Sequence, residues 1–271
     1  MNPEKANVVM PAKAGISGVG EQRPETPAFA GVTKVICVIA LATLMASTAH
    51  AQAWQCRPTT FLPRPALELP EAGQVRRTPV AGYTLALSWS REYCRGRERD
   101  PAMRFQCSGN IGDFGFVLHG LWPEGQGPDY PQYCRSVGVL SRKIVADNIC
   151  MTPSPQLIQH EWAKHGTCMA KTPEAYFGAA KLLFGALEFP DMDRLSRQVE
   201  RGTPLTAGGL AAAFADLNDG LPANAVKVKT NDKGWLQEVR ICLGRDLKPH
   251  RCPAFAQGIS DKATVKVWRG R

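Results

Sequence analysis

Residues 83–89, YTLALSW, alternate apolar side chains with small or polar ones, which predicts a half-buried β-strand. Residues 236–243, LQEVRICL, roughly share this alternation, and residues 225–229, AVKVK, alternate with lysines facing outward. Residues 114–118, FGFVL, form a short apolar run after Gly112. We therefore predict four strands.

Helical spacing of apolar residues dominates the middle of the chain, and Pro or Thr stands at the start of three of these segments. We predict helices over residues 137–149, 156–164, 173–187 and 207–217. Strands and helices mix without strict strand–helix–strand alternation, so an α+β fold fits better than a doubly wound parallel sheet. We expect one central antiparallel sheet with helices packed on one side of it.

The first 51 residues have the pattern of a secretory leader. An apolar run at 35–46 follows the basic Lys34 and precedes Ala49-His50-Ala51, a small-residue cleavage site. This run is shorter than the roughly 20 residues that span a bilayer. Residues 1–31, rich in Pro and Gly, indicate either a misplaced start codon or a disordered leader. We expect a secreted or periplasmic product without a membrane anchor after residues 1–51 are removed.

The remaining residues, 52–271, suffice for a single domain with its own hydrophobic core. Their first part, residues 52–82, is rich in Pro, Arg and Thr without a period. This composition predicts an irregular N-terminal surface segment that only Cys56 ties down. We expect the core to begin after this segment, and the protein to be a monomer.

The chain is basic, with a formal net charge of +9 at pH 7. Four Lys or Arg and three Asp or Glu lie in the leader, so residues 52–271 retain 29 basic and 21 acidic side chains. Such a balance favours a polyanionic partner such as nucleic acid, but many basic exported proteins bind none.

Eight of the nine cysteines lie outside the leader. An even number in an exported chain predicts four disulfides, but eight cysteines allow 105 pairings and the sequence does not choose among them. The chain has no C-x-x-C pair, which counts against a zinc ribbon or a thioredoxin-like redox site.

Three of the five histidines lie in two short segments. His119 lies in FVLHGLWPE, and His160 and His165 lie in HEWAKHGTC. Of the other two, His50 belongs to the leader, and His250 lies in a loop-like stretch where we interpret it as structural. The gathering of three histidines beside a glutamate and a lysine predicts a functional site.

On a regular helix, His160 and Lys164 form one i, i+4 pair, and Glu161 and His165 form a second. The pair His160-Glu161 also looks like the start of H-E-x-x-H, the zinc motif of metallopeptidases. That motif needs histidines four residues apart, whereas these are five apart, about 140° around the helix axis. We therefore expect neither a metal site nor metallopeptidase activity.

Two histidines, a lysine and a glutamate suit cleavage of a phosphodiester by the neighbouring 2′-hydroxyl of RNA. One imidazole removes the proton from this hydroxyl, a second protonates the leaving 5′ oxygen, and a cation stabilises the charge on phosphorus. Because histidine titrates near pH 6.5, one can be neutral while the other is charged. The residues alone do not fix which histidine is the base and which is the acid.

These two segments, at 116–124 and 160–168, resemble the two active-site segments of the ribonuclease T2 family. The similarity extends to LALSW at 85–89 and to CMTPSP at 150–155. The resemblance implies a disulfide-stapled α+β ribonuclease fold and cleavage of single-stranded RNA with little base specificity. It also implies 2′,3′-cyclic phosphate products, their slower hydrolysis to 3′-phosphates, no cofactor and no cleavage of DNA.

The resemblance also implies roles for the five candidate catalytic residues. By matching position, His165 is the base, His119 is the acid and His160 contacts the phosphate. Glu161 and Lys164 then stabilise the pentacoordinate phosphorus.

Three further residues match positions that bind the base in this family. Trp122 corresponds to a stacking tryptophan, although a core tryptophan is an alternative, and an aromatic face suits sequence-tolerant recognition. Glu124 corresponds to an acidic group that hydrogen-bonds the base, and Tyr130 adds a second ring. Ser88 stands where many relatives have a glutamine near a second base, which leaves that subsite open.

The resemblance implies disulfides as well, in the pairs Cys134–Cys168, Cys94–Cys107, Cys242–Cys252 and Cys56–Cys150. An inactive secreted RNA-binding protein is the alternative from another functional class, and it predicts losses among the catalytic residues. The chain lacks none of them.

Overall fold

The computed structural model describes residues 53–54, 56–57 and 61–270. The expected leader, residues 1–51, lies outside the described residues. Within the described part, no helix is long and apolar enough to cross a membrane.

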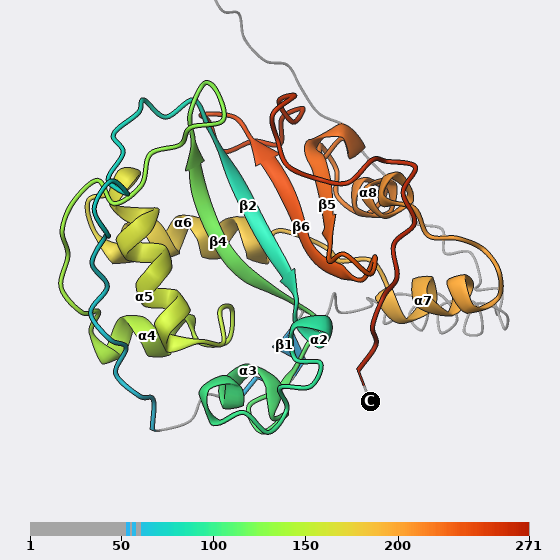
Figure 1. The fold of residues 1–271 in the computed structure, drawn as a ribbon, viewed down its shortest axis with the longest axis horizontal. Helices are drawn as coiled ribbons and strands as arrows, with labels where there is room; N and C mark the ends of the chain where they lie inside the picture. Colours follow the sequence, from blue (N-terminus) through green and yellow to red (C-terminus); the bar gives the residue numbers. More distant parts are fainter. Residues whose placement is uncertain (1–52, 55, 58–60, 271) are drawn as a thin grey trace, which may run out of the picture. The chain divides into compact units, whose positions relative to one another are not determined.

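Four antiparallel strands form the central sheet in the order β4, β2, β6, β5 (Figure 1). Their bounds are Phe116–Glu124 for β4, Gly82–Trp89 for β2, Leu236–Leu243 for β6 and Val226–Thr230 for β5. The predicted strand at 114–118 is too short at its end, because β4 continues through the whole HGLWPE segment. Pro123 is tolerated in this strand because β4 lies at the edge of the sheet.

The described residues also form five longer helices: α4 (Arg142–Asn148), α5 (Pro155–Lys164), α6 (Pro173–Gly185), α7 (Met192–Glu200) and α8 (Ala207–Ala215). Each begins at a Ser, Thr or Asp whose side chain accepts a hydrogen bond from a backbone N–H of the first turn. The prediction of a helix over 137–149 is wrong at its start, because Ser141 caps α4. Helix α7 was not predicted.

The remaining elements are short. Strands β1 (Ala53–Trp54) and β3 (Asp113–Phe114) form a separate antiparallel pair. The short helices are α2 (Ser90–Tyr93), α3 (Arg104–Cys107) and the 3-10 turns Pro101–Met103, Gly166–Cys168 and Ala223–Ala225.

The two faces of the sheet differ in character, as the alternation predicts. One face carries buried apolar side chains, including Leu85, Leu87, Val239 and Ile241, and α6 passes behind it (Figure 1). Helix α5 contacts β4 at one edge, and α8 contacts β5 at the other. The opposite face carries polar and charged side chains and is left open for a site. The expected α+β fold with helices on one side of an antiparallel sheet is confirmed.

Four disulfides fasten the chain, and they join the same pairs that the family resemblance implies. The Cys134–Cys168 bond ties the loop after β4 to the end of α5, with the two Cα atoms 5.0 Å apart. The Cys242–Cys252 bond folds the loop after β6 back onto the strand.

Residues 61–81 contain no helix or longer strand, and the expectation that only Cys56 ties down the N-terminal segment is wrong. The backbone N–H of Ala66 donates to Gln156 Oε1 of α5 at 2.8 Å. The backbones of Arg76 and Gln132 pair in both directions. The segment therefore crosses the surface of α5, close to the predicted catalytic residues.

Candidate active site

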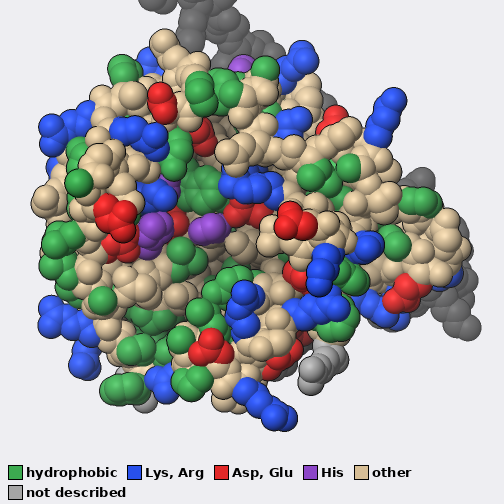
Figure 2. Space-filling model, viewed as in Figure 1, with side chains coloured by type: hydrophobic (Ala, Val, Ile, Leu, Met, Phe, Trp, Pro, Cys, Tyr) green, Lys and Arg blue, Asp and Glu red, His purple; other side chains and the backbone are tan. Residues whose placement is uncertain are grey.

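All eight predicted site residues line one cavity of about 830 Å³. Strand β4 supplies His119, Trp122 and Glu124, the following loop supplies Tyr130, and the end of α5 supplies His160, Glu161, Lys164 and His165. In the space-filling view, histidine side chains lie in a hollow with Lys and Arg side chains beside it (Figure 2). Residues far apart in the sequence therefore converge on one site.

A β-bulge sets the direction of the His119 side chain. Ala86 of β2 pairs with Gly120, and Leu87 pairs with Leu118, so His119 is the extra residue of β4. Bulges redirect side chains next to many active sites. The ring of His119 reaches across to β6, where its Nδ1 lies 2.7 Å from Glu238 Oε2.

The surroundings of His119 favour its protonated form. Burial lowers its pKa, but the hydrogen bond to Glu238 and the negative charges of Glu161 and Glu238 outweigh burial and raise it above 6.5. Because Nδ1 donates to Glu238, the second proton is on Nε2, which faces Glu161 Oε1 at 3.8 Å. The residue therefore presents a proton donor to the cavity.

His165 has the opposite character. It caps the C-terminus of α5, and only 4% of the residue is exposed. Burial, followed by the positive charges of Lys164, His160 and His119, lowers the pKa of His165 well below 6.5. Its Nδ1 is buried without a hydrogen-bond partner among the described residues. A neutral imidazole in this position is a proton acceptor.

Glu161 is a carboxyl whose pKa is shifted toward neutral pH. Its Oε2 accepts a hydrogen bond from Trp122 Nε1 at 2.8 Å, while its buried Oε1 has no hydrogen-bond partner among the described residues and faces His119 Nε2 at 3.8 Å. Burial raises its pKa to about 7, although the charge of His119 acts in the other direction. Near neutral pH this carboxyl can therefore either donate or accept a proton.

Two glycines of the motifs are required by close packing. A Cβ on Gly120 would lie 1.8 Å from Glu161 Oε2 and 2.5 Å from Trp122 Nε1. A Cβ on Gly166 would lie 2.5 Å from the Trp162 ring. A side chain at either position would displace the residues that build the site.

His160 is held by a glutamate from the N-terminal segment. Its Nδ1 lies 2.5 Å from Glu68 Oε1, which also accepts a hydrogen bond from the Tyr133 hydroxyl at 2.8 Å. Burial lowers the pKa of His160, and the positive charge of Lys164 adds to this, while Glu68 opposes it. Tyr133 has a positive φ of 51°, and its N–H donates to the Lys164 carbonyl oxygen at 2.8 Å. This unusual backbone conformation next to the site is held from both ends.

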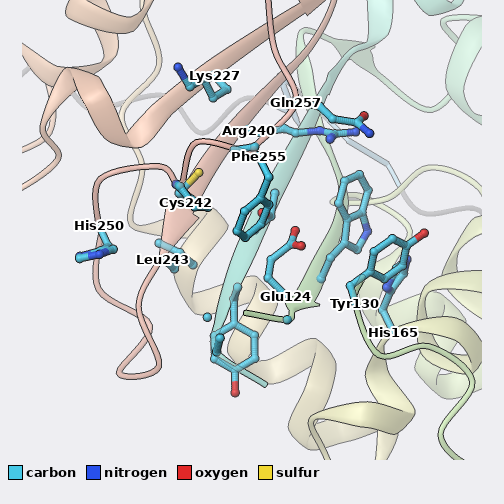
Figure 3. Close-up of a pocket in the computed structure, with 18 of the residues that line it drawn as sticks. Glu124, Tyr130, His165, Lys227, Arg240, Cys242, Leu243, His250, Phe255 and Gln257 are labelled. Atoms are coloured by element: carbon cyan, nitrogen blue, oxygen red, sulfur yellow. The ribbon is translucent and has the colours of Figure 1, made fainter. Parts of the chain in front are cut away.

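The predicted base-binding residues form the next part of the cavity. The Trp122 ring has the guanidinium of Arg240 over it, 4.8 Å from the ring centroid. The Tyr130 ring lies almost parallel to His165, with the ring centroids 6.0 Å apart (Figure 3). Burial raises the pKa of Glu124, although a hydrogen bond with Thr84 opposes this. Aromatic rings and a hydrogen-bonding carboxyl thus lie beside the histidines.

A model of the ribonuclease T2 family matches residues 81–252. The chain belongs to the ribonuclease T2 family. A probable ribonuclease of Haemophilus influenzae is 36% identical over 136 residues, which cover 46% of this chain and 49% of that protein. This chain therefore spans about half the length of that relative. A ribonuclease of Aeromonas hydrophila is 34% identical over 165 residues, which cover 60% of this chain and 72% of that protein.

Solved structures of this fold agree with the family assignment. RNase NT, crystallised in complex with 5′-AMP, aligns with a TM-score of 0.53 and 21% identity, covering 70% of this chain and 98% of that chain. An RNase-related protein from Calystegia sepium aligns with a TM-score of 0.54 and 21% identity, covering 70% and 97%. At this identity, the likeness shows the ribonuclease T2 fold alone.

Three residues of the T2 site were missed by the sequence reasoning: Glu68, Glu238 and Arg240. Glu238 and Arg240 stand two apart on β6, so they share the face of the sheet that carries the site. Arg240 Nε donates to Glu238 Oε1 at 2.6 Å. This alternation was a usable signal, whereas no local pattern connects Glu68 with His160.

The geometric argument against a metal site is wrong. The angle around the helix axis does not keep the two histidines apart, because His165 at the C-cap retains αR backbone and its ring lines the same cavity as that of His160. As a result, one ligand atom each of His160, Glu161 and His165 lie within 4.8 Å of one another. The spacing in the sequence therefore does not exclude a metal ion here.

Proposed function

We propose that this ribonuclease T2 member is an exported endoribonuclease that cleaves single-stranded RNA by attack of the 2′-hydroxyl, with histidines as acid and base. The observation that carries this proposal is the placement of His119 and His165 against one tryptophan ring, in surroundings that shift their pKa values in opposite directions. Their ring centroids lie 5.0 and 5.5 Å from that of Trp122. A charged donor and a neutral acceptor thus face one reaction centre at the same pH.

In the first step, His165 removes the proton from the 2′-hydroxyl, and the 2′ oxygen forms a bond to phosphorus. The bond from phosphorus to the 5′ oxygen breaks, and His119 Nε2 gives this leaving oxygen its proton. The products are a 2′,3′-cyclic phosphate and a free 5′-hydroxyl. In the second, slower step, the roles reverse: His119 activates water, His165 protonates the 2′ oxygen, and a 3′-phosphate forms.

Three groups suit the extra negative charge on the pentacoordinate phosphorus. The ammonium of Lys164 lines the cavity, and its charge acts on Glu161. Glu161 can donate a hydrogen bond from its protonated form, because its pKa is about 7. His160, whose Nδ1 faces Glu68, adds an N–H from Nε2 when its ring is protonated. Donors fixed before the substrate binds are the most effective kind of electrostatic stabilisation.

The base of the cleaved nucleotide would lie against Trp122 and Tyr130, with Glu124 as hydrogen-bonding partner. Recognition by stacking supports low base specificity, since every base has an aromatic face. Because Arg240 covers part of the Trp122 ring, a base stacks on the remaining face or displaces the guanidinium. The four disulfides support a secreted or periplasmic location, since such bonds persist in oxidising compartments.

The direct test is incubation of a defined single-stranded RNA with the protein in EDTA, with products identified by mass spectrometry. Cyclic phosphate ends that convert to 3′-phosphates support the proposal, and the cut positions report base preference. DNA and 2′-O-methyl RNA of the same sequence lack the attacking hydroxyl and should stay intact. Binding without cleavage would favour the inactive RNA-binding protein, and chelator-sensitive proteolysis would favour the metallopeptidase.

A further inference from the structure

The cavity extends well beyond the predicted catalytic and base-binding residues. Its far part, here called the loop arm, is lined by the end of β6, by β5 and by the loop at residues 244–257. Cavities that hold one drug-sized ligand measure about 300–1,000 Å³. At about 830 Å³, this cavity lies in the upper part of that range, so it has room for a ligand larger than a single nucleoside.

The loop arm is fixed in shape before any ligand binds. The Cys242–Cys252 disulfide and the hydrogen bond from the His250 N–H to the Cys242 carbonyl oxygen fold the loop onto β6. The Ile259 N–H donates to the Val228 carbonyl oxygen at 2.9 Å, which ties the end of the loop to β5. A preformed site loses little conformational entropy on binding.

The loop arm carries excess positive charge. Lys227 and Arg240 lie directly opposite each other on β5 and β6, an arrangement that is unfavourable for two like charges. Arg245 and Arg251 line the same arm, Arg240 is paired with Glu238 at 2.6 Å, and no carboxylate is found among the described residues of the arm that line the cavity. Such a cluster is best neutralised by an anionic ligand.

An aromatic ring lies among these cations. Phe255 is 37% exposed, lines the arm, and points toward the same part of the cavity as Glu124 (Figure 3). His250 lies apart from these side chains, on the far side of the loop (Figure 3). Cations beside an accessible ring are the recurring elements of sites for single-stranded nucleic acid.

The position of the loop arm indicates which nucleotide it meets. Along β4, His119 is followed by Trp122 and then Glu124. The leaving 5′ oxygen at His119 and the base at Trp122 and Glu124 therefore lie at successive positions along this strand. The pairing of Glu124 with Gly82, and of Tyr83 with Leu243, brings the start of the loop to the Glu124 end. The chain on the side away from the leaving group therefore extends toward the loop.

We propose that the loop arm binds the nucleotide that precedes the cleaved nucleotide, with its base on Phe255 and its phosphate near Lys227 and Arg240. This subsite rests on the proposed function, since the catalytic residues define the direction of the RNA chain. This subsite makes the protein cleave longer RNA segments more efficiently than dinucleotides.

The test compares three substrates that each contain a single ribose, so that only one bond in each can be cleaved. They are a dinucleotide, the same dinucleotide extended by a deoxynucleotide on its 5′ side, and the same extended on its 3′ side. We expect the 5′ extension to raise kcat/KM by about 5- to 150-fold, the range of base–aromatic stacking. This gain should decrease as the salt concentration rises, with the slope expected for about one additional phosphate contact.

Variants assign the gain to the arm. Phe255→Ala and Lys227→Ala should each reduce the ratio of the two kcat/KM values, while Phe255→Trp should retain it. Lys262→Ala is the matched control, because this exposed lysine does not line the cavity. A 5′ extension without a gain, or a gain that both variants retain, would overturn the subsite. A gain confined to the 3′ extension would overturn its assignment to the preceding nucleotide.

Failure of the proposed function has a different signature, since then none of the three substrates is cleaved. Fluorescence anisotropy with all-deoxy di- and trinucleotides still measures the arm in that case. Tighter binding of the trinucleotide that Phe255→Ala removes would support the subsite, and equal binding would refute it.

Discussion

Glu238→Gln should change the pH dependence of RNA cleavage. The substitution removes the charge that faces His119 Nδ1 at 2.7 Å, while an amide of nearly the same shape remains. The hydrogen bond to Glu238 and its charge help to raise the pKa of His119, so this pKa should fall. Because the acid must be charged, the basic limb of the kcat/KM profile should move to lower pH.

The size of the effect follows from the interaction that is lost. A hydrogen bond to a charged group contributes about 1.5–3 kcal/mol. On the basic limb, where activity is proportional to the charged fraction of His119, this corresponds to about a 10- to 150-fold loss of kcat/KM. At acidic pH, where His119 is charged in both proteins, the difference should shrink.

The measurement is kcat/KM for a dinucleotide from about pH 4 to 9, for the unchanged protein and the variant. Glu188→Gln is the matched control, because Glu188 is exposed and does not line the cavity. A uniform loss at every pH, with the basic limb unmoved, would refute the assignment of Glu238 to the protonation of His119.

Three further predictions concern the supports of the site. Gly120→Ala should destabilise the fold by about 1–3 kcal/mol and abolish cleavage, because its Cβ collides with Glu161. Thermal unfolding measures the loss of stability. Gly178→Ala is the control, because Gly178 in α6 has open space around it, and it should not destabilise the fold. Glu68→Gln should weaken substrate binding about tenfold, through loss of the charged partner of His160; an unchanged KM would refute this role. Zinc ions should inhibit rather than activate, because a metal held by His160, Glu161 and His165 occupies the base; activation by zinc would contradict the assigned base.

The sequence predicted the fold class and the central strands, but it missed one helix and the start of another. The period-two stretches at 83–89 and 236–243 located the central strands, because one face of each is buried and the other is not. Helix α7 was missed because its buried apolar residues are few, chiefly Met192 and Leu195. The residues at 137–140 look helical by apolar spacing, but the Ser141 side chain caps the next turn and starts α4 there.

The two motifs supplied seven of the eight candidate residues, and Tyr130 of the loop after β4 came from its matching position in the family. The carboxylates that face the histidines are distant in sequence, since Glu238 lies 119 residues from His119 and Glu68 lies 92 residues from His160; alternation on its strand indicates only the face of Glu238. Only tertiary structure brings such pairs together. The spacing of five residues did not exclude a metal site, because the ligand atoms of His160, Glu161 and His165 lie within 4.8 Å of one another in the cavity.

The most direct test of the acid and base assignment varies the leaving group. In a nucleoside 3′-(4-nitrophenyl phosphate), the leaving group is stable without a proton, so the acid becomes unnecessary. In EDTA, His119→Ala should lower kcat/KM for a dinucleotide by about 10²- to 10⁴-fold but leave the nitrophenyl ester nearly unaffected, whereas His165→Ala should impair both. Equal losses on both substrates for His119→Ala would contradict its role as the general acid.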